Sequence, residues 1–272
     1  MSNVASTGTL AETIERRSVP PGQVAAWWLG GSGLALKTAS GATVFIDPYL
    51  SDSVRAIFGL ERDFPPPLAP EEVRADLVIC THWHEDHLDP GTIPLIARHS
   101  SETQFLMPPS AMSRAAGWGV SPKRITLFSP GEVTEVKGVR ISHVLARHDP
   151  GIPGWQAPDA MGVVLEADGI TIYNSGDTEY DARLRRLPFP KVDAAFVCIN
   201  GVTGNMNALE AALLVHQQGA RIVVPVHHRL WARNDYPEAT LDPNLFAETY
   251  RRLGGAGRVV LPEIGGEILL SG

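Results

Sequence analysis

The stretch Thr81-His82-Trp83-His84-Glu85-Asp86-His87-Leu88-Asp89-Pro90 places three imidazoles and Asp86 within six residues, directly after the apolar run Leu77–Cys80. Side chains alternate along an extended chain, so we expect His82 and His84 to leave the strand on the same side. Asp86 and His87 follow in the turn and can face a second point. Neutral imidazole is the commonest ligand of zinc and similar metals, and a carboxylate completes the coordination or handles a proton. The pattern favours two adjacent metal sites over a polar surface turn.

The length and charge of the chain limit the classes of protein to which it can belong. With 272 residues and 44% hydrophobic content it can bury a large core, and we expect one domain over 1–272, with a helix and lead-in over 1–20. A net charge of -7 without a basic cluster argues against nucleic acid as a partner. The segment 1–17 lacks the apolar run of a signal peptide or membrane span, so we expect a soluble cytoplasmic protein with no membrane partner. Cys80 and Cys198 lie in apolar runs and are expected to be buried free thiols.

Strand and helix patterns alternate along the chain and predict an α/β fold. The glycines of Gly30–Gly33 lack the spacing of a nucleotide-binding loop and predict a tight hairpin between two strands. Residues 51–72 carry Pro65-Pro66-Pro67 and are expected to form an irregular surface loop. Strands are expected at 24–29, 34–38, 43–46, 77–80, 104–107, 161–166, 170–173, 192–199, 221–226, 259–261 and 267–270, and several more within 124–146. A short helix is expected to end at 16–17, and further helices are expected at 91–99, 109–118, 208–218 and 244–253.

Further candidate ligands lie at the ends of downstream strands. His148 opens a loop rich in glycine and proline, whereas His143 lies inside a strand and is not expected to bind metal. Asp177 follows Gly176 at a strand end, where a carboxylate can approach two metals or, alternatively, cap a helix. His227 and His228 follow Val226, and side-chain alternation allows only one of them to face the metals directly.

The His-x-His-x-Asp-His pattern of residues 82–87 resembles the metallo-β-lactamase superfamily of binuclear metallohydrolases. The resemblance implies a four-layer αββα sandwich that binds two divalent ions, zinc or manganese. It also implies that Pro225-Val226-His227 selects His227 over His228, and that Asp47, at a strand end, orients a ligand imidazole. The implied ligands are His82, His84 and His148 for one metal, Asp86, His87 and His227 for the other, and Asp177 for both.

Several stretches look like the L-ascorbate-6-phosphate lactonase branch of this superfamily: Trp27–Gly30, Ser175–Asp177 and Val224–Trp231. Two metals acidify a bridging water and polarise a carbonyl or phosphoryl oxygen, so the resemblance implies hydrolysis of an ester-like bond. The expected substrate is a lactone of a small sugar-derived or anionic compound, with Asp86 returning a proton to the leaving alkoxide. A homo-oligomer is compatible with this reading. The candidate substrate contacts are Trp155, His228 and Trp231, together with Arg229 and Arg233, which either bind an anionic group or lie on a solvated helix face.

Three other functions remain open at this point. A phosphodiesterase, including one that acts on lipids, is favoured if the protein binds a phosphodiester analogue and hydrolyses no lactone. A mononuclear iron thiol dioxygenase is favoured if metal analysis finds one iron per chain. The complete set Asp86, His87 and His227 argues for two metals instead. A binding module without catalysis is least favoured, because no ligand is missing from the set.

Overall fold

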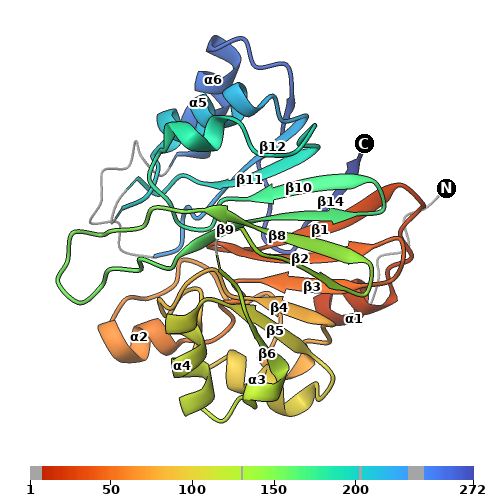
Figure 1. Cartoon of the computed structure of the whole chain (residues 1–272), viewed down its shortest axis with the longest axis vertical. Helices are drawn as coiled ribbons and strands as arrows, with labels where there is room; N and C mark the ends of the chain where they lie inside the picture. Colours follow the sequence, from red (N-terminus) through yellow and green to blue (C-terminus); the bar gives the residue numbers. More distant parts are fainter. Residues whose placement is uncertain (1–7, 130, 202–203, 232–241) are drawn as a thin grey trace.

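The computed structural model describes residues 8–129, 131–201, 204–231 and 242–272. Two seven-stranded sheets pack face to face between two layers of helices (Figure 1). The α/β class and the four-layer αββα sandwich expected from the sequence are confirmed.

The first sheet has the strand order β14-β1-β2-β3-β4-β5-β6. Its strands from β14 to β3 are antiparallel, and those from β3 to β6 are parallel. Gly30 pairs with Gly33, so the predicted tight hairpin is present. The bounds are β1 Gln23–Gly30, β2 Gly33–Thr38, β3 Thr43–Ile46, β4 Leu77–Ile79, β5 Gln104–Met107, β6 Ile125–Leu127 and β14 Glu267–Ser271.

The second sheet has the order β13-β12-β11-β10-β9-β8-β7. Strands β10 to β13 are parallel and β7 to β10 are antiparallel. The carboxyl ends of β10 and β12 therefore lie at one edge, where ligands of open α/β sheets commonly bind. The bounds are β7 Val133–Val136, β8 Val139–Leu145, β9 Met161–Ala167, β10 Ile170–Asn174, β11 Ala194–Cys198, β12 Ile222–Val226 and β13 Arg258–Val259.

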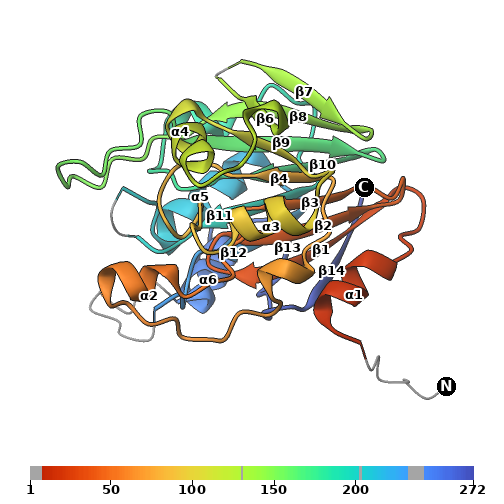
Figure 2. The same cartoon turned by 90° about the horizontal axis from the view of Figure 1, so that it is seen from below.

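Helices cover the outer face of each sheet. The helices α1 Leu10–Arg16, α3 Ile93–His99 and α4 Pro109–Gly117 pack on the first sheet, and Figure 2 shows α1 and α3 in front of it. The helices α5 Ala208–Gln218 and α6 Pro243–Arg252 cover the second. Asn207 caps α5 by accepting the N–H groups of Leu209 and Glu210. None of the helices in the described part of the chain has the length and apolarity to cross a membrane.

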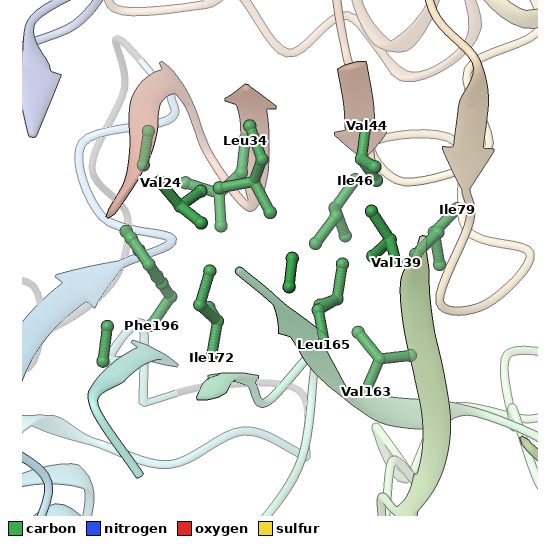
Figure 3. Packing of buried hydrophobic residues seen from close by; sticks show 14 of the residues in the cluster. Val24, Leu34, Val44, Ile46, Ile79, Val139, Val163, Leu165, Ile172 and Phe196 are labelled. Atoms are coloured by element: carbon green, nitrogen blue, oxygen red, sulfur yellow. The ribbon is translucent and has the colours of Figure 1, made fainter. Parts of the chain in front are cut away.

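Both faces of the central strands are buried, which explains their continuous apolar sequences. In β3, Val44 and Ile46 face the other sheet, whereas Phe45 faces the helices. Figure 3 shows side chains of the two sheets pointing toward one another, among them Ile46 and Leu165 of β9. Each such side chain contributes about 1.5 to 3 kcal/mol on full burial. The two cysteines are buried and free, as predicted.

The expectation of an irregular loop over residues 51–72 is wrong in part. Ser53–Phe58 forms helix α2, which ends at Gly59 with φ 73°, and Pro70–Glu72 forms a single 3-10 turn. Val54 of α2 is buried against Tyr49 and Leu230. Tertiary packing therefore stabilises a helix of six residues that is too short to be recognised by periodicity.

Asp89 ties this segment to the histidine-rich turn. Its carboxylate is fully buried, with 0% exposure, and joins residues on either side of β4. A buried carboxylate is tolerated only when its oxygens are fully hydrogen-bonded. It accepts hydrogen bonds from the N–H groups of Leu50, Ser51 and Gly91 and from the hydroxyls of Ser51, Ser53 and Thr92, at 2.5 to 3.2 Å.

Candidate metal centre

The seven side chains expected as ligands converge from both sheets. Two backbone hydrogen bonds join the sheets beside them: Met161 N–H donates to Thr81 O at 3.0 Å, and His227 N–H donates to Gly31 O at 2.8 Å. The ligand atoms form three overlapping groups, each within 4.8 Å, that could hold a metal: two outer groups, described below as the first and the second, and a group of His82, His87 and Asp177 that joins them. Their members are His82, His84, Asp86 and His87 after β4, His148 after β8, Asp177 after β10, and His227 after β12.

The first group consists of His82, His84 and His148. His82 Nε2 lies 2.9 Å from His84 Nδ1, which lies 3.1 Å from His148 Nε2. The remaining nitrogen of each ring has a hydrogen-bond partner: Thr81 Oγ1 for His82 at 3.2 Å, Trp155 O for His84 at 2.8 Å, and Gly204 O for His148 at 3.2 Å. The Thr81 hydroxyl gives its own proton to Asp47 at 2.7 Å, so it accepts from His82.

These partners assign the tautomers of the first group. The ring N–H groups point outward, and three nitrogen lone pairs face one common point. Burial lowers the pKa of His82 well below its usual value and that of His84 to about 4, so both rings are neutral at pH 7. Three nitrogen lone pairs at such distances cannot bond to one another, and a cation between them resolves the conflict. The residues therefore fit a metal ion bound by nitrogen.

The second group consists of Asp86, His87 and His227. His227 Nε2 lies 3.3 Å from His87 Nε2 and 3.4 Å from Asp86 Oδ2. Burial opposes the charged form of both imidazoles, but Asp177 and nearby carboxylates outweigh it and raise the pKa of His87 well above normal and that of His227 to about 9. Burial likewise opposes ionisation of Asp86, yet His87 and His227 lower its pKa to about 2. Positive charge is therefore favoured here, whether a proton or a metal supplies it.

Asp177 lies between the two groups. Its Oδ2 is 3.4 Å from His87 Nε2 and 3.9 Å from His148 Nε2, and its Oδ1 is 3.4 Å from His227 Nε2. Asn205 Nδ2 donates to Oδ2 at 2.7 Å and fixes the orientation of the carboxylate. One carboxylate thus faces ligand atoms of both groups, which is the arrangement that a bridging ligand requires.

The backbone at the site adopts conformations that side chains usually avoid. Asp47 and His227 have φ values of 45° and 58°, in the left-handed region. Gly176 has φ 54°, and a Cβ there would lie 2.5 Å from Met161 O. Only glycine is therefore accommodated directly before Asp177. Strained positions of this kind concentrate at functional sites.

Asp47 supports the turn that carries the ligands. Its carboxylate accepts the N–H of Thr81 at 2.7 Å and the Nδ1–H of His87 at 2.8 Å, and it is fully buried. It therefore holds Nδ1–H of His87 away from the second group and turns Nε2 toward it, which is the contact that an orienting residue makes.

Replacing Asp47 with alanine is expected to weaken metal binding by about 10- to 100-fold, because the ring of His87 loses its partner. Titration of metal into the stripped variant, followed by calorimetry, measures this change. Asp63→Asn, at a carboxylate that is 37% exposed and pairs with Arg229 rather than with a candidate ligand, is the matched control. Unchanged affinity in Asp47→Ala would remove the orienting role.

The residues expected to contact substrate lie in different environments. Trp155 lies beside the first group, with its ring centroid 5.3 Å from that of His84. His228 is buried and stacks on Trp28 at 4.8 Å, and Trp231 packs near Tyr49 at 6.0 Å. The Arg229 side chain is 71% exposed and lies 3.4 Å from Asp63. Arg233 lies outside the described residues.

Sequence reasoning missed several contacts that orient the ligands. Thr81 links Asp47 to His82, but a hydroxyl next to a histidine has no distinctive pattern. Asn205 lies 28 residues from the aspartate it binds, and its residue type does not mark it as part of the site. The carbonyls of Trp155 and Gly204 belong to the backbone, so residue types cannot reveal them.

Comparisons with known proteins show which proteins this chain resembles. The family model for the Beta-lactamase superfamily domain matches residues 26–227. The "Probable L-ascorbate-6-phosphate lactonase" of Escherichia coli strain E2348/69 is 27% identical over 264 residues, covering 82% of this chain and 74% of the relative. A metallo hydrolase from Ignicoccus hospitalis superposes with a TM-score of 0.69 at 22% identity over 91% of this chain and 98% of its own. An isothiocyanate hydrolase from Delia radicum gut bacteria gives 0.68 at 18%, over 90% and 98%.

Proposed function

We propose that this chain opens the ester bond of a lactone ring. The premise is its family: the chain belongs to the metallo-β-lactamase superfamily of hydrolases. The similarity to L-ascorbate-6-phosphate lactonases, at 27% identity, supports a lactone as the reacting group. A small sugar-derived or anionic lactone is the substrate that this relationship favours.

One observation carries the proposal: two groups of ligand atoms lie side by side, with Asp177 facing both. His82, His84 and His148 would hold one divalent ion, Asp86, His87 and His227 the other, and Asp177 would contact both. When bound, the ions would supply Lewis acidity toward a carbonyl oxygen and lower the pKa of a water. Zinc or manganese suits this mixture of nitrogen and oxygen ligands.

The protein groups have separate tasks in ring opening. Asp47 and Asn205 hold His87 and Asp177 in their orientations. The side chain of Asp86 is 19% exposed, whereas those of Asp177 and His227 are 5% exposed. Asp86 is therefore the carboxylate of the site that is open to a bound substrate. In this proposal Asp86 returns a proton to the alkoxide that leaves when the ester bond breaks.

Metal-loaded protein is expected to hydrolyse compact lactones with a higher kcat/KM than a β-lactam or duplex DNA. A sugar-phosphate lactone and its unphosphorylated analogue are compared in wild type and in Arg229→Ala. If Arg229 leaves Asp63 to hold a phosphate, the variant raises KM for the phosphorylated lactone alone. The increase should correspond to the loss of one charged hydrogen bond, which contributes about 1.5 to 3 kcal/mol. Robust phosphodiester cleavage without lactone turnover would overturn the proposal.

Metal affinity is expected to rise with pH up to about 9. The pKa of His227 in the metal-free chain is raised to about 9, and that of His87 well above normal, so protons occupy these rings at pH 7. A metal must displace them, and each displaced proton makes affinity rise about tenfold per pH unit. Competition with a chelator from pH 6.5 to 9.5 measures the slope, and a flat profile would contradict it.

The metal-free fold should show the opposite dependence. The pKa of His227 lies above its ordinary value of 6.5, so the contribution to folding free energy is complete below pH 6.5. It is lost as pH rises through about 9. Denaturant unfolding of stripped protein at pH 6.5 and 9.5 distinguishes this loss from the gain in metal affinity.

A further inference from the structure

We propose that Ile57, Phe58, Ile152 and Trp155 form a subsite for an uncharged apolar substituent of the substrate, such as an alkyl chain or an aromatic ring. These four side chains are called the apolar patch. Ile57 is 52% exposed, Phe58 40% and Ile152 45%, and Trp155 is half-buried. The inference rests on the proposed lactone hydrolysis and specifies the substrate further.

The apolar patch begins at the metal centre. The ring of Trp155 lies 5.3 Å from that of His84, one of the converging ligands, and 5.2 Å from that of Phe58. Ile57 precedes Phe58 at the end of α2, and Ile152 O accepts the N–H of Trp155 at 3.0 Å. Ring contacts therefore lead from His84 through Trp155 to Phe58 of α2, and Ile57 and Ile152 are exposed apolar side chains close to these two rings in the chain.

Hydrogen bonds hold the loop of Trp155 in place. His84 donates to Trp155 O at 2.8 Å, and Trp83 Nε1–H donates to Gln156 O at 3.2 Å. Trp83 is only 8% exposed, so this attachment is anchored in the core. The same contact that orients His84 thus positions Trp155, which couples substrate recognition to the metal centre.

The charged groups near the apolar patch are already engaged. Arg55 of α2 lies 3.1 Å from Glu61, and Arg114 lies 3.5 Å from Glu85 with its guanidinium 3.9 Å from the Trp83 ring. Arg62 donates to the carbonyls of Tyr49 and Ser51. The side chains that the structure describes here offer apolar contact and no unpaired cation, which favours an uncharged group.

Single exposed apolar side chains are ordinary, but contiguous ones beside a catalytic centre indicate a ligand. A substituent attached to the reacting ring reaches the patch at no additional cost of association, because the ring already binds nearby. Each methylene that it buries should raise kcat/KM by about fourfold.

The test is a series of γ-alkyl γ-butyrolactones with side chains of increasing length, assayed with metal-loaded protein. In wild type, kcat/KM is expected to rise by about fourfold per methylene over the first few carbons. Phe58→Ala and Ile152→Ala should flatten this dependence. Leu127→Ala, on β6 and 45% exposed, is the matched control and should behave as wild type.

A binding measurement separates this inference from the proposed function. Calorimetry with 2-alkylcyclopentanones, which lack the ester bond, should show affinity that rises with chain length in wild type and not in Phe58→Ala. If no lactone is hydrolysed but this pattern holds, the proposed function fails and the subsite stands. The subsite is overturned if chain length has no effect in either assay. It is also overturned if the only defect of Phe58→Ala is a change in co-sedimentation with lipid vesicles.

Discussion

Asp177→Asn is expected to lower kcat/KM for lactone hydrolysis by more than about 100-fold. Loss of a residue behind a ligand already costs 10- to 100-fold, and Asp177 faces both groups of ligand atoms directly. The asparagine retains the shape of the side chain but removes the negative charge that compensates two cations. Steady-state kinetics and metal content of the purified variant measure the effect.

A second measurement follows the charge itself. In stripped protein, burial opposes protonation of His227, and Asp177 is the largest influence that raises its pKa to about 9. Asp177→Asn should lower the pKa of His227, which an NMR titration follows. His228→Ala is the comparison for activity and should lower activity much less than Asp177→Asn does. Equal losses of activity in the two variants would instead give His228 the ligand role.

His82→Ala and His84→Ala are each expected to abolish measurable hydrolysis and lower metal occupancy, while the fold persists. Each change removes one of three lone pairs that face a common point, leaving too few nitrogen ligands to hold that ion. The core between the sheets does not depend on these rings, because its members come from the strands. Elemental analysis and circular dichroism check the two parts of this expectation.

His143→Ala is the control for these variants. It removes a half-buried imidazole from β8 that packs near Phe128, with ring centroids 5.7 Å apart, and belongs to none of the groups that could hold a metal. Its metal content should equal that of wild type. Full activity of His82→Ala or His84→Ala in a metal-replete assay would refute the assignment of the first group.

The sequence predicted that these seven side chains would lie together, because they are placed at strand ends and strands have a clear apolar pattern. His82 and His84 follow β4 directly, and Asp177 follows β10 after a glycine that nothing larger can replace. Two adjacent histidines after β12 were separable in principle, since an extended chain turns successive side chains apart. The left-handed conformation of His227 shows that the chain is no longer extended there, which alternation alone could not reveal.

The contacts that orient the ligands were not predictable in the same way. Asn205 and the carbonyls of Trp155 and Gly204 act through tertiary placement, and their residue types do not distinguish them from other loop positions. Helix α2 was missed because its six residues make less than two turns, and because the following prolines dominate the local pattern. Of the apolar patch the sequence predicted only Trp155 as a substrate contact, since Ile57 and Phe58 belong to α2 and no sequence pattern brings Ile152 to the site.

The six hydrogen bonds to Asp89 bear on how the molecule opens. Loops usually unfold locally at little cost in free energy, ahead of the core. Here the start of the long β3–β4 connection cannot separate from the histidine turn without exposing a buried carboxylate that has lost its donors. We therefore expect Leu50 to Ser53 and the turn that follows β4 to open together, so that the histidine turn fluctuates less than a free loop would.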